Sequence, residues 1–216
     1  YGEISEYHNN VKTAIDLEVT SSSAFLPQSE RGYNGMVLYD LENNQEYANS
    51  PWSLSVPYAY QQTDGSLTQR SGSCNMPSYI ELTKSQNQAI ISCSDMSNSA
   101  ALNNDTNDVI LVVDVSDPTA AATTSLFLGY IPTCDNPTVM HLTDDEKYLL
   151  ALCSGSDMLI TIPWSDYKSA SATGIEQDYV FGLGFEVGPE PSDLAVIGTT
   201  AYVTDVLQNK IYKIDY

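Results

Sequence analysis

The sequence has few basic residues, no long apolar run and no helical periodicity. Eight Lys and Arg stand against 28 Asp and Glu, so the formal net charge is −20 and the sequence pI is about 4.1. The electrostatic field of so negative a chain repels nucleic acid and anionic lipid, which excludes both as partners. No apolar run approaches the roughly 20 residues of a membrane-spanning helix, so we expect no membrane insertion. Without a 3.6-residue apolar period, the sequence favours β-strands over helices.

Two stretches bounded by cysteines repeat the same pattern. The cysteines of the pairs Cys74 and Cys93 and Cys134 and Cys153 are both 19 positions apart, with Pro at the fourth position of each stretch and Leu-Thr at the ninth and tenth. Weaker copies of the pattern follow Asn10 and begin at Pro191. Three short apolar runs bounded by turn residues recur in every copy, which is typical of strands in a repeat protein.

A fourth run precedes each copy and is expected to form an outer strand. Its candidates are residues 2–7, 66–69, 125–131 and 179–185, of which 66–69 is the weakest. The predicted fold is therefore an all-β propeller, one domain over residues 1–216, with four-stranded repeats at roughly 2–41, 66–115, 125–163 and 178–216. We expect residues 2–7 to complete the last blade, because this would close the ring and hide its edges.

Two segments resemble known propeller repeats. Residues 108–119, D-V-I-L-V-V-D-V-S-D-P-T, are similar to the signature of LVIVD-repeat β-propellers, and 194–205 resemble the related Tyr-Val-Thr-Asn repeats. This resemblance implies a secreted or cell-surface protein. Because such families usually have more than four blades, the chain is expected to form either a small self-closed ring or part of a larger ring.

The four cysteines are expected to form two disulfides, Cys74–Cys93 and Cys134–Cys153. In each repeat one cysteine precedes the first strand and the other ends the second, so both lie at the same end of one hairpin. Each bridge would contribute about 3 kcal/mol by loop entropy. Four cysteines allow three pairings, a link between blades among them, and buried free thiols remain an alternative. Disulfides would imply an oxidising, extracellular compartment, and Asn104-Asp105-Thr106 is a predicted glycosylation site.

Polar residues recur at the entry to the innermost strands and suggest a cation site. These positions are Asn10, Asn75, Asp135 and Glu190, and fourfold repetition would place them around the mouth of the channel. Their oxygens suit Ca²⁺, which takes about 6–8 oxygen ligands. The alternative is that they are ordinary polar loop residues. Asp16, Glu81 and His141 share another equivalent position and are also expected to face the channel.

Two long insertions, 42–65 and 164–178, carry aromatic residues among Pro, Ser and Gln. Such loops are usually functional or flexible, and aromatic rings among polar groups suit a protein or glycan partner. The alternative is that the rings only cover the base of two blades. The predicted partner-binding residues are Tyr47, Trp52, Tyr58, Tyr60, Trp164 and Tyr167.

Catalytic signatures are scarce. His8 and His141 are the only histidines, and the sequence contains neither H-E-x-x-H nor G-x-S-x-G. Asp144-Asp145-Glu146 is expected to be a solvated hairpin turn. The sequence therefore predicts a secreted or cell-surface, non-catalytic binding or scaffold propeller with no required cofactor. The alternatives are a metal-dependent, hydrolase- or lactonase-like enzyme with its site at the channel mouth, and a structural subunit that self-associates through outer strands.

Overall fold

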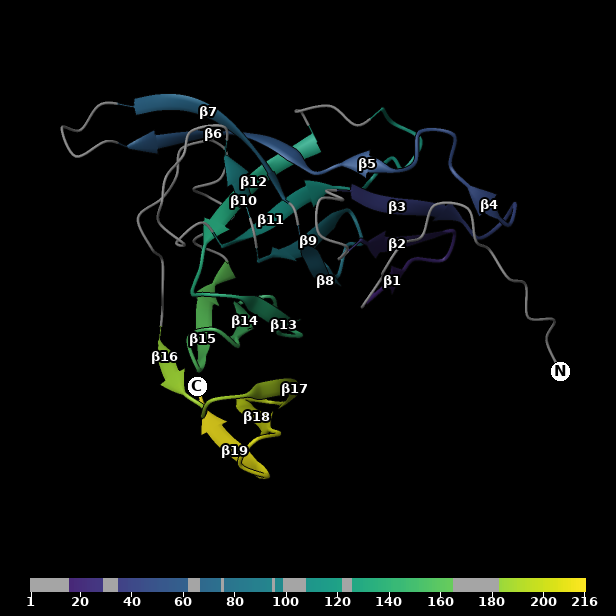
Figure 1. Ribbon diagram of the computed structural model, residues 1–216. Coiled ribbons are helices and arrows are strands. Elements are labelled where there is room, and N and C mark those ends of the chain that lie inside the picture. Colours follow the sequence, from purple (N-terminus) through teal and green to yellow (C-terminus); the bar gives the residue numbers. More distant parts are fainter. Residues whose placement is uncertain are drawn as a thin grey trace, which may run out of the picture.

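The regular elements in the part of the chain that the structure describes are antiparallel β-strands, which confirms the all-β class (Figure 1). The structure is a computed structural model that describes residues 16–28, 35–61, 67–74, 76–94, 96–98, 108–121, 126–164 and 183–216. Within these ranges, no helix has the length and apolar character needed to cross a membrane.

Four sheets follow one another along the chain. The first sheet contains β1 (Glu18–Val19), β2 (Ser23–Pro27), β3 (Gly35–Asp40), β4 (Gln45–Glu46) and β5 (Trp52–Ser53). The second contains β8 (Pro77–Leu82), β9 (Gln88–Cys93), β11 (Val109–Asp114) and β12 (Phe127–Pro132). The third contains β13 (Pro137–Leu142), β14 (Tyr148–Cys153), β15 (Met158–Pro163) and β16 (Gly184–Glu186). The last contains β17 (Pro191–Ile197), β18 (Thr200–Asp205) and β19 (Lys210–Asp215).

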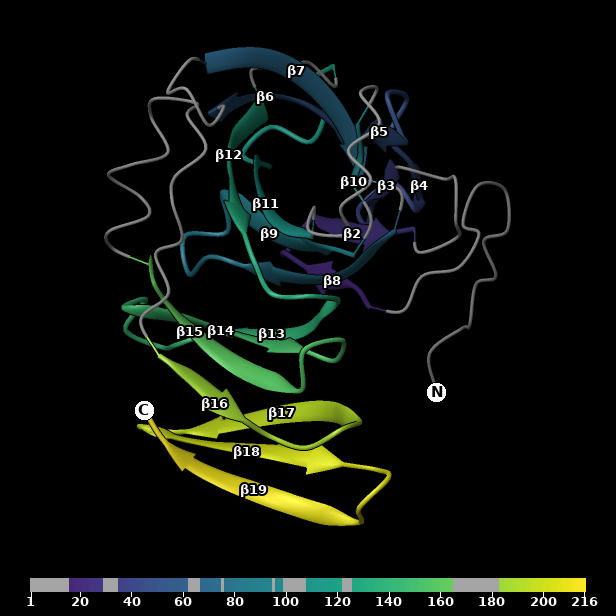
Figure 2. The same cartoon turned by 60° about the vertical axis from the view of Figure 1, so that its left-hand side comes forward.

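A fifth sheet stands outside this series. It pairs β6 (Ser55–Gln61) with β7 (Leu67–Cys74), and the end of β7 with β10 (Met96–Asn98). We call the β6–β7 pair the ribbon. Figure 2 shows the ribbon at the opposite end of the molecule from the last sheet.

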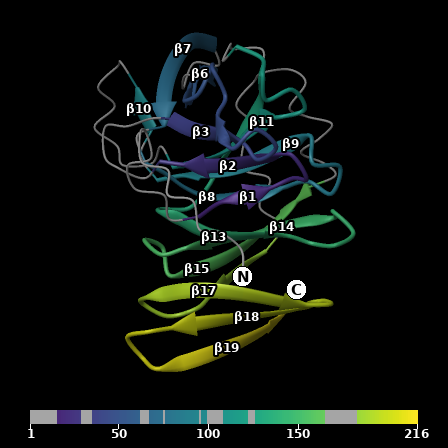
Figure 3. The same ribbon diagram turned by 90° about the vertical axis from the view of Figure 1, so that its right-hand side faces the viewer.

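The four consecutive sheets stack face to face in chain order (Figure 3). Strand β8 contacts β2 on one side and β13 on the other, and β13 contacts β17. Each gap between neighbouring sheets is filled by one apolar cluster. Because the second and third sheets are covered on both faces, their central strands are continuous apolar runs such as V-I-L-V-V in β11. Strand β18, T-A-Y-V-T-D, instead alternates between buried and half-buried residues.

The repeated Leu-Thr dipeptide is explained by the turn that follows it. The carbonyls of Thr83 and Thr143 accept hydrogen bonds at 2.7 Å from the amides of Gln86 and Glu146, which have φ of 56° and 52°. Thr143 Oγ1 accepts a further bond from the amide of Tyr148 at 3.1 Å. The threonine hydroxyl thus replaces backbone partners in a tight turn. The hairpin turn predicted at residues 144–146 is confirmed.

The outer strands agree with the prediction in two sheets and differ in a third. β12 and β16 overlap the predicted runs, each ending one residue beyond its run, and they pair with β11 and β15. The prediction for residues 66–69 is wrong, because Leu67–Gln69 begin β7 and pair with β6. The short strands β4 and β5 occupy the outer position of the first sheet instead, pairing with β3. The closing strand predicted at residues 2–7 lies outside the described residues, so the four-bladed ring stays a prediction.

Candidate partner-binding ribbon

The ribbon is a regular antiparallel hairpin, although its first strand lies in the loop predicted over residues 42–65. Its register runs without a shift from Ser55 opposite Ser73 to Gln61 opposite Leu67. Tyr58 lies opposite Arg70, and Tyr60 opposite Thr68. Since alternate residues of a strand share a face, the two tyrosines occupy neighbouring positions on one face of the ribbon. Two predicted partner-binding residues thus stand at alternate positions of β6, and Arg70 and Thr68 are their register partners in β7.

The ribbon and its approach are uncharged overall in a strongly acidic chain. Between residues 47 and 74 the only acidic residue is Asp64 and the only basic residue is Arg70, so this stretch has a net charge of zero. The whole chain carries −20. The low charge and the many Tyr, Ser, Thr and Gln residues distinguish the ribbon from the rest of the molecule.

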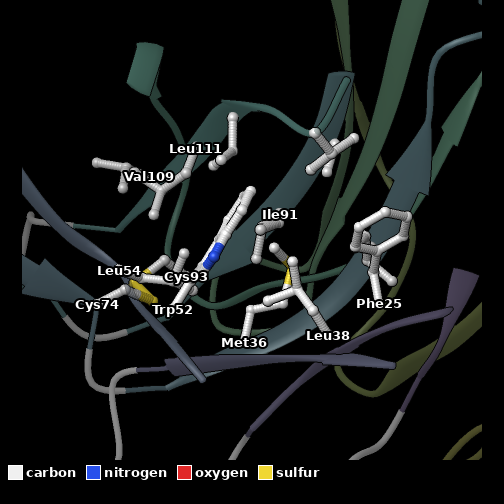
Figure 4. Packing of buried hydrophobic residues seen from close by; sticks show 14 residues of the cluster. Phe25, Met36, Leu38, Trp52, Leu54, Cys74, Ile91, Cys93, Val109 and Leu111 are labelled. Atoms are coloured by element: carbon white, nitrogen blue, oxygen red, sulfur yellow. A yellow bond between two sulfur atoms is a disulfide. The ribbon is translucent and has the colours of Figure 1, made fainter. Parts of the chain in front are cut away.

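The base of the ribbon is fixed to the core. Trp52 and Leu54 precede β6, and each is only 1% exposed in the cluster between the first and second sheets (Figure 4). The Cys74 amide, at the end of β7, donates to the Leu54 carbonyl at 3.0 Å. Cys74 is also bonded to Cys93 of β9. The ribbon therefore has a rigid attachment, which lowers the entropy that its residues would lose on binding.

Three residues of the predicted aromatic surface have a different environment. Trp52 and Trp164 are corrected to core residues, because their exposed fractions are 1% and 0% and both pack in apolar clusters. Tyr47 is half-buried against the first sheet, where its hydroxyl lies 2.8 Å from Ser23 Oγ. These rings cover the sheets, which is the alternative that the sequence left open. Tyr167 lies outside the described residues.

Both predicted disulfides are confirmed. Cys74–Cys93 and Cys134–Cys153 have Cα–Cα separations of 5.7 and 5.8 Å, which suit a disulfide. Neither the free-thiol reading nor a link between successive repeats holds for these four cysteines. The glycosylation site predicted at Asn104 lies outside the described residues.

The predicted cation ring remains a prediction. Asn10 and Asn75 lie outside the described residues, while Asp135 and Glu190 are exposed. The Asp135 amide donates to Ser156 Oγ at 2.9 Å, and the Glu190 carbonyl accepts from the Val206 amide at 3.1 Å. In the part of the chain that the structure describes, no three His, Cys, Asp or Glu side chains are grouped closely enough to hold a metal ion.

Carboxylates in or just before the first strands of two sheets reach the next sheet. Asp16 Oδ2 accepts a hydrogen bond at 3.1 Å from the amide of Ile80 in β8. Burial raises the pKa of Glu81 to about 7, with added repulsion from Glu18 and Asp16, although a hydrogen bond from the Leu142 amide of β13 opposes the shift. Burial lowers the pKa of His141.

We call the predicted set of equivalent positions, Asp16, Glu81 and His141, the inner row. The strand register corrects one of its members. Glu18 lies opposite Phe25, Glu81 opposite Ile90 and His141 opposite Leu150. Each of these three apolar partners faces the following sheet in the stack. Glu18, rather than Asp16, therefore occupies the position equivalent to Glu81 and His141.

The sequence did not predict that Arg70 and Thr68 pair with the two tyrosines. The alternation of Val56, Tyr58 and Tyr60 was a strand signal, but Pro57 within it weakened the signal. Proline is tolerated there because β6 is an edge strand of the ribbon sheet.

Comparisons with known proteins bear on the fold. No protein-family profile and no curated protein matches the chain. Among solved structures, the chain is similar to hydrazine synthase of Kuenenia stuttgartiensis, with a TM-score of 0.50 and 13% identity over 90% of this chain and 68% of that one. A putative 6-phosphogluconolactonase from Bacteroides fragilis gives a TM-score of 0.48 and 15% identity over 81% of this chain and 39% of that one. A putative 6-phosphogluconolactonase from Bacteroides uniformis gives a TM-score of 0.40 and 16% identity over 78% of this chain and 37% of that one.

These likenesses concern architecture. At 13% identity the first shows the fold alone, and together with the stack of antiparallel sheets it supports a β-propeller-like class. The chain spans about two fifths of the length of the two lactonase structures. The LVIVD-type assignment stays a prediction.

Proposed function

We propose that the chain is a secreted or cell-surface, non-catalytic binding module that presents the ribbon to a protein or glycan partner. The observation that carries this proposal is the ribbon itself, a hairpin that carries two tyrosines, lies outside the stack of sheets and belongs to a stretch of zero net charge. Tyrosine provides a large, rigid contact area at low entropic cost, and such residues are enriched in binding surfaces.

Two further observations support the proposal. The disulfide and the buried Trp52 hold the ribbon against the core, so binding would order few additional residues. The two disulfides also support an oxidising and hence extracellular location.

A ribbon-replacement variant tests the proposal. Residues 56–72 are replaced by Asn-Gly, which joins Ser55 to Ser73 through a two-residue hairpin turn of the favoured type. Both proteins are immobilised and exposed to extracellular proteins and to surface glycans from the organism that encodes the chain. We expect a ligand to be retained by the native chain and not by the variant, with intact disulfides and an unchanged thermal midpoint as the folding controls.

Two outcomes would contradict the proposal. Equal retention by both proteins would place the contact surface elsewhere. Retention that disappears in EDTA and returns with Ca²⁺, together with turnover of the ligand, would favour the metal-dependent enzyme instead.

A further inference from the structure

The first and last sheets of the stack each have one neighbouring sheet in the series, whereas the two sheets between them have two (Figure 3). Seven of the nine large apolar side chains that are exposed in the described part of the chain lie in or beside the first and last sheets. Single apolar residues on a surface are ordinary, but their concentration on two surfaces indicates contact sites. The strand register shows which positions of the repeat these residues occupy.

Ile211 of β19 occupies a position that is fully buried in the other three sheets. Its equivalents, found from the pairing of the third strand of each sheet with the second, are Met36, Ile110 and Leu159, all 0% exposed. Each of these three packs in the apolar cluster between its own sheet and the following one. Ile211 is 70% exposed. The last sheet thus keeps the apolar residue of a sheet-to-sheet contact, although no described sheet follows it in the stack.

The first sheet has the same property on its opposite face. Leu17 and Val19 flank Glu18, and they are 52% and 48% exposed. The equivalent pairs of the other three sheets are also apolar, and they pack in or against the cluster between their own sheet and the preceding one: Ile80 and Leu82, Met140 and Leu142, and Leu194 and Val196. The first sheet therefore exposes the residues that elsewhere contact a preceding sheet.

We propose that the last sheet of one copy of the chain packs on the first sheet of a second copy, an inference that goes beyond the proposed function. Three gaps of this kind exist within the chain, each formed by the following face of one sheet and the preceding face of the next. Ile211 belongs to an exposed following face, and Leu17 and Val19 belong to an exposed preceding face. A second copy thus offers the surface that completes a fourth gap.

The arrangement of the sheets favours a ring of two copies. Within one chain the second and third sheets separate the two exposed faces (Figure 3). The stack follows a curve from the first sheet to the last (Figure 1). Because the contact joins two different faces, it repeats head to tail, and two copies form the smallest closed assembly in which every such face is covered. Two chains of net charge −20 repel each other, so we expect salt to strengthen their association.

Sedimentation equilibrium of the native chain over a range of protein concentrations tests the proposal. One chain has a mass of 23.6 kDa, and we expect the mass to rise to twice this value, at lower protein concentration when the salt concentration is high. Ile211→Lys and Leu17→Glu should each weaken the association by about tenfold or more, because each places a charge in an apolar contact. In dilute solution, where single copies predominate, both positions are solvated, so both variants should keep the native unfolding free energy.

An equimolar mixture of the two variants should recover the association. In a mixed pair, one gap joins the introduced lysine to the introduced glutamate, and the other gap is native. Leu183→Glu is the matched control, because Leu183 is 58% exposed beside the outer strand β16 and belongs to neither end face. This control variant should associate as the native chain does.

Four results would overturn the proposal. The first is a native chain with the mass of a single copy at every concentration up to its solubility limit. The second is a mass that grows beyond two copies, since this would show open head-to-tail growth instead of a closed ring. The third is a Leu17→Glu variant that associates normally while Ile211→Lys does not, which would indicate contact between two last sheets. The fourth is a mixture of the two variants that remains as weakly associated as each variant alone.

Discussion

The third and last sheets contain the same hairpin in two different environments. In β14, Leu150 and Leu152 face the last sheet and are fully buried. The register places Tyr202 and Thr204 at the equivalent positions of β18, on the face that no described sheet covers. On this face Ile197 and Ile211 are 71% and 70% exposed. Tyr202 and Thr204 thus replace two buried leucines on this face, where they lie beside the exposed Ile197 and Ile211.

The two sheets also differ where the third has its disulfide. Pro137 lies opposite Cys153, and Pro191 lies opposite Asp205. Cys134 and Gly188 each stand three residues before the proline, so Gly188 and Asp205 occupy the positions of the bridge. A Cβ at Gly188 would overlap the carboxylate of Asp205. Close packing of a buried carboxylate against glycine thus takes the place of the covalent link.

Truncation of one leucine gives the largest expected contrast. Leu150→Ala should lower the free energy of unfolding by about 3–4 kcal/mol, because it leaves a cavity between two sheets. Ile211→Ala in the last sheet should cost less than about 0.5 kcal/mol, because that side chain is already solvated. Urea unfolding of both variants measures the difference. Equal losses would show that another surface covers the outer face of the last sheet.

Removal of the third-sheet disulfide should have a slightly smaller effect. The Cys134→Ser, Cys153→Ser double variant should lose about 3 kcal/mol, because the unfolded chain regains the freedom of a 19-residue loop. Asp205→Ser at the equivalent position of the last sheet provides the comparison. If both changes lower the urea midpoint equally, the disulfide and the Gly188–Asp205 contact contribute alike.

A third contrast concerns the inner row, where Ala195 of the last sheet stands at the position of Glu81. The pKa of Glu81 is raised from 4.5 to about 7, so the folded protein holds this proton more tightly than the unfolded chain does. The stabilisation by protonated Glu81 is fully present below about pH 4.5 and is lost as the pH rises through about 7. Because the group is partly solvated, the free energy of unfolding should change by about 2 kcal/mol over this range.

The Glu81→Gln variant isolates this effect. Subtracting its unfolding free energy from that of the native chain at each pH should give a curve that declines between about pH 4.5 and 7. A flat difference curve would show that Glu81 ionises equally easily in the folded and unfolded states.

The smallest expected contrast lies within the last sheet. Gly188 and Gly198 both have positive φ, at 86° and 62°, so alanine is strained at either position. Only Gly188 lies against another residue, whereas a Cβ at Gly198 would meet nothing within 4 Å. Gly188→Ala should therefore cost about 1 kcal/mol more than Gly198→Ala. Thermal midpoints of the two variants measure this, and a larger loss for Gly198→Ala would contradict the packing at Asp205.

The repeat explains why much of the fold could be predicted. Pro, Leu-Thr and Cys recur at fixed spacing, and the structure gives each a role in a strand entry, a turn or a bridge. The ribbon could not be predicted in the same way, because it occurs once and Pro57 interrupts its alternation. The burial of Trp52 and Trp164 also escaped prediction, since an aromatic residue among polar neighbours gives no sign of whether a sheet or solvent covers it.

The Cys74–Cys93 bridge has a mechanical consequence. It joins the end of β7 directly to β9, a central strand of the second sheet. A tension applied along the ribbon by an attached ligand would pass through a covalent bond into the middle of the stack, without first peeling β10 away from β7. Detachment under tension would then be decided by how firmly the ligand adheres to the ribbon, since the anchorage at its base does not yield before the second sheet itself does.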